Sequence, residues 1–197
     1  MKVSKLIKKK QEIIKIAKFL YNNKYVVASD GNLSIRLDSQ KILITRSNVC
    51  KGEIGLKDII ALPLNLTNNH INKLKVQPSS EYQMHKGIYY TRADVNFIIH
   101  AHPLYATLIG ASNIQLNFEL VGEIEKYLGT IGYIEYFEPG SIQLANAVSE
   151  KATKCDIIIL KRHGVVITGK NSIEARYRLE RLERLAQISF LFNLSRH

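Results

Sequence analysis

The stretch "VNFIIHAHPLYATLIGAS", residues 95–112, joins an apolar run to a helical pattern that Pro103 opens. The run predicts a buried strand, and proline is favoured in the first turn of a helix. His100 and His102 end the strand. Because successive strand side chains alternate between faces, both imidazoles point the same way and can reach one metal ion. Alone, such a pair does not distinguish metal ligands from two histidines that are merely surface or hydrogen-bonded groups.

A second buried strand ends in the same manner. In "CDIIILKRHG", residues 155–164, His163 lies where the apolar run gives way to a turn. Three histidines at strand ends can form the three-nitrogen shell of a catalytic zinc, with a fourth position open for substrate. The remaining histidines have simpler interpretations. His70 lies in a predicted turn, His85 lies in a predicted helix where packing or capping explains it, and His197 is at the chain end.

The rest of the chain mixes helical and strand patterns. Helices are predicted at 4–23, 78–92, 103–112, 120–129, 139–153 and 172–192, and strands at 25–37, 41–46, 95–102, 131–137, 155–164 and 165–169. A hairpin is predicted around Asn68 and Asn69. Since strict βαβ alternation is missing, we expect one α/β domain over 1–197, with a largely antiparallel sheet flanked by helices on both faces.

Composition narrows the function classes. The 197 residues carry 28 Lys and Arg against 17 Asp and Glu, a net charge of +11. The lysines are scattered and no stripe of base-stacking aromatics accompanies them, so we expect no nucleic-acid partner. A lysine-rich solvated surface explains the charge, as does a field that concentrates small anions such as sugar phosphates.

The sequence also indicates the cellular compartment in which we expect the protein. No apolar run approaches the ~20 residues needed to cross a bilayer, so we expect no membrane partner. The first helix lacks the apolar core of a signal peptide. Cys50 and Cys155 lie far apart and fit no paired pattern, which favours a reducing compartment. We therefore expect a cytoplasmic protein.

Two polar segments suggest an anion site. In "PSSE", residues 78–81, two hydroxyls stand at a predicted helix N-terminus, where free N–H groups attract phosphate. The simpler interpretation is a capping box formed by Ser80 and Gln83. A capped helix end can also bind phosphate, so the two interpretations are compatible. In "ASDGNLS", residues 28–34, Gly31 permits close backbone approach and Asn32 adds an amide donor, although a bare turn explains both.

Together, "GNLS" (31–34), "ITRSN" (44–48), "PSSE" (78–81), "HAH" (100–102) and "RHG" (162–164) resemble the class II aldolase/adducin family. The likeness is greatest to its L-fuculose-phosphate aldolase-like members and runs from the first helix into the last. Its most specific part is "SSE" followed without a gap by "YYTRADVNFIIHAHP".

The resemblance implies a site and a reaction. It implies that His100, His102 and His163 hold a divalent metal, zinc or another, and that Glu81 is the acid/base carboxylate and a further metal ligand when substrate is absent. It also implies cleavage of a phosphorylated ketose of the L-fuculose 1-phosphate type into dihydroxyacetone phosphate and an aldehyde, through a metal-stabilised enediolate. Phosphate-binding positions carry over to Gly31, Asn32, Ser47, Asn48, Ser79 and Ser80.

The same resemblance implies a three-layer fold and a homotetramer with sites between subunits. Some positions depart from the family pattern. Asn48 stands where glycine is usual, and Arg46, where proline is usual, is either a phosphate ligand or a surface cation. Where the family carries an acidic tyrosine, this chain offers Glu123 or Glu119 as the second catalytic acid, or simply exposed glutamates.

Alternatives from other classes remain. A methylthioribulose-1-phosphate dehydratase of methionine salvage also pairs zinc with a carboxylate, but that branch usually reads "PSAE". A ribulose-phosphate 4-epimerase tends to carry aspartate at the position of Glu81. An adducin-like binding module would lack the metal site, whereas all three histidines and Glu81 are present here.

Overall fold

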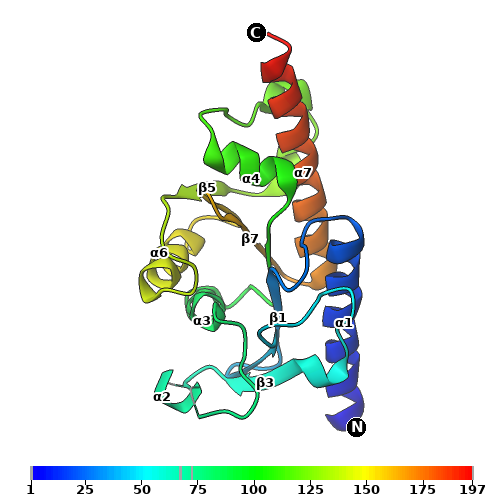
Figure 1. Cartoon of the computed structure of the whole chain (residues 1–197), viewed down its shortest axis with the longest axis vertical. Coiled ribbons are helices and arrows are strands. Elements are labelled where there is room, and N and C mark those ends of the chain that lie inside the picture. Colours follow the sequence, from blue (N-terminus) through cyan, green and yellow to red (C-terminus); the bar gives the residue numbers. More distant parts are fainter. Residues whose placement is uncertain (1, 67, 72, 197) are drawn as a thin grey trace.

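The computed structural model describes residues 2–66, 68–71 and 73–196. Seven strands form one sheet in the order β3-β2-β1-β4-β7-β6-β5, and neighbouring strands are antiparallel except for the parallel pair β5 and β6 (Figure 1). The strands are β1 Asn32–Arg36, β2 Lys41–Thr45, β3 Ile59–Pro63, β4 Phe97–Ala101, β5 Ile131–Ile134, β6 Ile157–Leu160 and β7 Gly164–Gly169. The helices are α1 Lys2–Asn22, η1 Leu56–Asp58, α2 Asn68–Ile71, α3 Tyr82–Thr91, α4 Leu104–Ala111, η2 Phe118–Leu120, α5 Glu125–Leu128, α6 Ile142–Ala152 and α7 Ser172–Leu194.

Helices cover both faces of the sheet. On one face α1, α4 and α7 pack over a core that includes Leu33, Ile99 and Ile167. On the other face α3 and α6 pack over a second core that includes Ile98 and Ile158 (Figure 1). Alternate residues of each strand therefore enter different cores, as the strand period requires. The predicted fold class, an α/β domain with a largely antiparallel sheet between helix layers, is confirmed.

Two local predictions are wrong. The strand predicted over 25–37 begins only at Asn32, because the preceding loop turns at Ala28 (φ 45°) and Gly31 (φ 68°) and leaves the sheet plane. The predicted hairpin at Asn68–Asn69 is the short helix α2. Pro63, which lacks an N–H, ends β3.

The predicted capping box of Ser80 and Gln83 is also wrong. Helix α3 begins at Tyr82, with Glu81 at its N-cap and no side-chain cap. The Glu81 N–H instead donates to Ser79 Oγ at 3.3 Å. The helix thus starts one residue later than the box requires, and this shift puts Glu81 at the junction between the loop and the helix.

Strand β4 lies at the centre of the sheet and gathers the residues of interest. Its pairing with β1 sets Asn32 opposite His100. Its pairing with β7 sets the β6–β7 turn beside the end of β4. Gly164 makes this close approach possible, since a Cβ there would lie 2.5 Å from both Ala101 O and His102 Cδ2. Sequence positions more than sixty residues apart therefore meet at one end of the sheet.

Gly31→Ala should destabilise the fold by about 1–3 kcal/mol in urea denaturation. The residue has a left-handed backbone, and a Cβ there would lie 2.7 Å from His100 O and from Val26 Cγ1. The matched control is Gly122→Ala, whose Cβ meets nothing within 4 Å; its stability should change by less than about 0.5 kcal/mol. Equal unfolding midpoints for the two variants would contradict the structural role of Gly31.

Candidate active site

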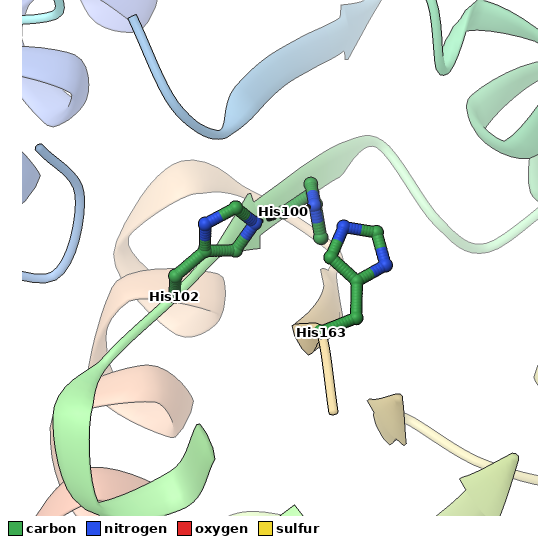
Figure 2. A group of neighbouring side chains, drawn as sticks. All are labelled: His100, His102 and His163. Carbon is green, nitrogen blue, oxygen red and sulfur yellow. Dashed lines mark hydrogen bonds between the residues drawn. The ribbon is translucent and has the colours of Figure 1, made fainter. Parts of the chain in front are cut away.

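The three histidines predicted from strand ends come together at one end of the sheet. His100 is in β4, His102 follows it directly, and His163 ends the β6–β7 turn. Figure 2 shows their rings turned toward a common space. Ring centroids are 4.8 to 5.2 Å apart, and one nitrogen from each ring lies within 4.8 Å of the others. This is a cluster able to hold a metal ion.

His100 is oriented by the backbone of β7. Its Nδ1 lies 3.0 Å from Val165 O, and because a carbonyl can only accept, Nδ1 carries the proton. When the ring is charged, Nε2 is protonated too and donates to Glu81; when the ring is neutral, as metal binding requires, Nε2 offers a free electron pair. It lies 3.1 Å from His102 Nε2 and 3.0 Å from Glu81 Oε2. With neutral rings, the electron pairs of the two histidines and of the Glu81 carboxylate face one point, which suits a cation. A backbone partner on the other ring nitrogen of His100 is typical of a metal-binding histidine.

Glu81 completes the cluster from the start of α3. Its side chain is buried, and Oε2 accepts a hydrogen bond from Asn32 Nδ2 at 2.8 Å. Its other oxygen, Oε1, lies 3.6 Å from His163 Nε2. Burial alone raises the pKa of Glu81, but the charge and hydrogen bond of His100 outweigh burial and lower it below its ordinary value. The carboxylate is therefore ionised, with one oxygen held and the other open.

The histidines differ in protonation. Burial and the neighbouring His100 lower the pKa of His102 to about 3, and the same two causes lower the pKa of His163 to about 4. Burial opposes the charge on His100, but Glu81 raises its pKa above the ordinary value. Two of the three imidazoles are thus in the neutral form that binds metal, and a metal at the third would displace a proton.

Two orphaned atoms test whether a metal fits. Within the described residues, Glu81 Oε1 and His163 Nδ1 are buried without a hydrogen-bond partner. His163 Nδ1 lies on the side of its ring that faces away from the other two histidines (Figure 2), whereas Glu81 Oε1 lies 3.6 Å from His163 Nε2 inside the cluster. Buried polar atoms are normally satisfied, so the orphaned Oε1 marks a place that another group completes. Three imidazoles and one carboxylate are a common donor set for zinc. The residues that could hold the ion are His100, His102, His163 and Glu81.

A polar cavity of about 290 Å³ opens beside the cluster. All six residues predicted to bind substrate line it: Gly31, Asn32, Ser47, Asn48, Ser79 and Ser80. Glu81, His102 and His163 line it too, so the predicted phosphate positions and the predicted metal cluster share one space.

Two loops form the wall of this cavity. Ser47 N–H donates to Gln77 O at 3.0 Å, and its Oγ donates to Pro78 O at 2.9 Å. Ser79 N–H donates to Thr45 O at 3.0 Å. Asn48, which stands where the family usually has glycine, has φ 54°, and asparagine tolerates this left-handed conformation better than most residues.

Some predicted residues are placed differently from their expected roles. The amide of Asn32 is already engaged by Glu81 and by His85 rather than free in the cavity. Arg46 lines the cavity and pairs with Asp58 at 2.6 Å. Glu123 is exposed and is not among the described residues that line the cavity.

Sequence reasoning missed one residue. His85 is fully buried and contacts Asn32 and Ser34, although helix packing or capping was its predicted role. The sequence feature that could have indicated this contact is the spacing of His85. It stands four residues after Glu81 and so follows it along one side of a helix.

Comparison with known proteins identifies the family and supports the fold. The family model for the class II aldolase and adducin N-terminal domain matches residues 11–190. An L-fuculose phosphate aldolase of Methanococcus maripaludis is 40% identical over 92% of this chain and 96% of its own length. A 3-oxo-tetronate 4-phosphate decarboxylase of Haemophilus influenzae is 28% identical over 92% of this chain and 86% of its own.

Among solved structures, an L-fuculose 1-phosphate aldolase aligns with a TM-score of 0.82 and 28% identity, over 94% of this chain and 86% of that one. The matching fold and the histidine cluster together describe an aldolase-type enzyme. The chain belongs to the class II aldolase and adducin family. The family resemblance seen in the sequence is confirmed. Within its described part, no helix is long and apolar enough to span a membrane.

His102→Ala should lower zinc affinity by on the order of 100-fold or more, because one of three converging nitrogens is removed. Metal content after dialysis against a weak chelator checks this, with circular dichroism as a measure of folding. The control is His70→Ala. His70 is an exposed residue of α2 and is not part of the histidine cluster, so this variant should keep its zinc. A folded His102→Ala protein with full zinc would refute the ligand assignment.

Proposed function

We propose that this protein is a zinc-dependent aldolase that cleaves a phosphorylated ketose of the L-fuculose 1-phosphate type into dihydroxyacetone phosphate and an aldehyde. The observation that carries the proposal is the position of Glu81. Its carboxylate lies against three convergent imidazoles and also lines the cavity of Ser47, Ser79 and Ser80. Acid/base group, metal cluster and anion site thus lie in one place. The names of the most similar relatives support the same choice.

Substrate binding would use the loops and the helix start. The phosphate would lie against the hydroxyls of Ser47, Ser79 and Ser80 and the N-terminal N–H groups of α3. Gly31 and Asn48 would let the backbone come close to it. The net charge of +11 would favour encounter with an anion. Fixing the phosphate would hold the bond to be cleaved beside Glu81.

Zinc or another divalent metal, held by His100, His102 and His163, with Glu81 as a further ligand before substrate binds, would supply a Lewis acid that neutralises charge on substrate oxygens. When the bond between the third and fourth carbons breaks, its electron pair stays with the third carbon. Glu81, ionised in the resting site, would first take up a proton from solvent as substrate replaces it at the metal site, and would then deliver that proton to the third carbon. In the reverse reaction the ionised Glu81 would remove it. Since Asn32 holds Oε2, the partnerless Oε1 is the atom suited to carry the proton.

The reaction also needs a group that removes the proton from the fourth-carbon hydroxyl as the aldehyde forms. Glu123 is our candidate for this group, which returns the proton in the reverse reaction. Because it is exposed and does not line the cavity of its own chain, it would act only from a neighbouring subunit. The proposal therefore includes a homotetramer with its sites between subunits. Cytoplasmic location likewise remains our proposal.

The deciding experiment offers the zinc-loaded protein three substrates separately. L-Fuculose 1-phosphate should yield dihydroxyacetone phosphate, followed with a coupled dehydrogenase. Loss of water from methylthioribulose 1-phosphate without carbon–carbon cleavage would instead make it a dehydratase. Release of carbon dioxide from 3-oxo-tetronate 4-phosphate would make it a decarboxylase, an activity named for one of its relatives.

Glu81→Gln should lower kcat by on the order of 100- to 10,000-fold, because the amide keeps the size of the side chain but carries no transferable proton. Inhibition by inorganic phosphate should change little, since the phosphate contacts lie elsewhere in the cavity. Glu125→Gln, at an exposed position of α5, serves as the control and should keep its turnover. Undiminished turnover of Glu81→Gln would remove Glu81 from the proton transfer.

A further inference from the structure

A buried row of polar side chains runs from Tyr89 to Glu81 beneath the histidine cluster. Tyr89 OH lies 2.8 Å from Ser34 Oγ, which lies 2.6 Å from His85 Nδ1. On the other side of the ring, His85 Nε2 lies 2.5 Å from Asn32 Oδ1, and Asn32 Nδ2 donates to Glu81 Oε2 at 2.8 Å. The exposure of these five residues is at most 6%, and Ser34 and His85 have none.

Strand and helix geometry produce this row. Asn32 and Ser34 alternate with Leu33 along β1, so both point toward α3. Glu81, His85 and Tyr89 recur every four residues and so lie along one side of α3 and its N-cap. A two-residue period on the strand therefore meets a four-residue period on the helix, and five side chains from two segments interleave.

The direction of every hydrogen bond in the row can be deduced. An ionised carboxylate only accepts, so the NH₂ group of Asn32 faces Glu81 and its carbonyl oxygen faces His85. That oxygen also only accepts, so His85 Nε2 carries the proton.

Burial and the neighbouring His100 lower the pKa of His85 to about 3, so the ring holds one proton and its Nδ1 is an acceptor. Ser34 O–H then donates to His85, and Tyr89 O–H donates to Ser34. All four hydrogen bonds point toward Glu81.

The far end of the row is anchored. The Arg36 guanidinium stacks 4.7 Å from the Tyr89 ring centroid and donates to Tyr89 O at 2.8 Å. It also donates to Val95 O and Arg92 O. Burial raises the pKa of Tyr89, which therefore remains a donor. The direction of the row is thus fixed at both ends, by a hydroxyl that stays protonated and by a carboxylate.

We infer that His85 is a positioning residue of the proposed aldol reaction, acting through Asn32 to hold Glu81 Oε2 and leave Oε1 as the proton-carrying oxygen. The His85 side chain does not line the substrate cavity and contacts none of the three clustered imidazoles, and its backbone N–H donates to Glu81 O at 3.4 Å as part of the helix. Without its Nε2–H, Asn32 Oδ1 loses the donor that holds the amide in place, so the amide can turn away from Glu81. The carboxylate would then rotate, and its two oxygens would exchange roles. The inference rests on the proposed function. The proton on His85 Nε2 and the fixed Asn32 amide, however, can be tested without turnover.

The variants are chosen to separate positioning from folding. His85→Leu removes both ring nitrogens, whereas in His85→Gln the side-chain amide can still donate to Asn32 Oδ1. Thr168→Val removes another fully buried hydroxyl, which donates to Asp156 O at 3.0 Å outside the row. This third variant reports what the loss of a buried hydrogen bond costs when the row is intact. Thermal unfolding of all three measures that cost.

In zinc-saturated protein, His85→Leu should lower kcat on L-fuculose 1-phosphate by about 10- to 100-fold. Its KM should stay within about threefold, and it should keep its zinc, because no metal-cluster nitrogen is touched. His85→Gln should recover most of kcat, and Thr168→Val should keep it. The inference is overturned if His85→Leu loses no more kcat than Thr168→Val, if His85→Gln is no better than His85→Leu, or if His85→Leu loses its zinc.

A spectroscopic arm tests the same row without substrate. In the wild-type protein, nitrogen-detected NMR should find the proton of His85 on Nε2 and slow hydrogen exchange of the Asn32 side-chain amide. That protection should be lost in His85→Leu and kept in His85→Gln. Protection unchanged in His85→Leu, or a proton on Nδ1 in the wild type, overturns the inference. If L-fuculose 1-phosphate is not cleaved while these signatures appear, only the proposed function fails and the row stands.

Discussion

The buried carboxylate of Glu81 is the group on which the site depends. An ionised carboxylate removed from water costs several kcal/mol unless charges and donors compensate for it. Here His100 lies 3.0 Å from Oε2, and Asn32 donates to the same oxygen. Both partners come from the neighbouring strands β1 and β4, so the charge of the buried carboxylate is compensated only where these strands are paired. Folding and site assembly are thus one event.

Close approaches and unusual backbone conformations cluster around this carboxylate. Outside glycine, the described residues with positive φ include Ala28, Asn48 and Arg162. Each lies within three residues of a group in the candidate site, namely Gly31, Ser47 or His163. Such conformations cost about 1–3 kcal/mol each and persist where surrounding structure fixes them. The fold accepts this cost where loops must turn sharply toward a shared cavity, while its strands and helices remain regular.

One buried cation helps to hold these loops. The Lys51 ammonium donates to Ser29 O at 2.8 Å and to Val49 O at 2.9 Å, and it ties the loop before β1 to the loop after β2. Burial lowers its pKa to about 8, and the charge of Asp30 opposes that shift. The lysine is therefore largely protonated at neutral pH and stabilises carbonyl groups that would otherwise lack donors. Its place in the sequence, in a run of short turns, gave no sign of this role.

The sequence by itself determined the fold class and most of the candidate site. Strand-end histidines and the "PSSE" segment could be found because each is a local pattern, a period of two along a strand or a short loop before a helix. The sequence could not determine where β1 begins, why Asn32 faces Glu81, or that His85 belongs to a polar row. Those facts depend on strand register, which places Asn32 opposite His100, and on hydrogen-bond directions that follow only once both segments are buried together. Tertiary structure alone decided them, because pairing across sixty-eight residues leaves no trace in the local pattern of either segment.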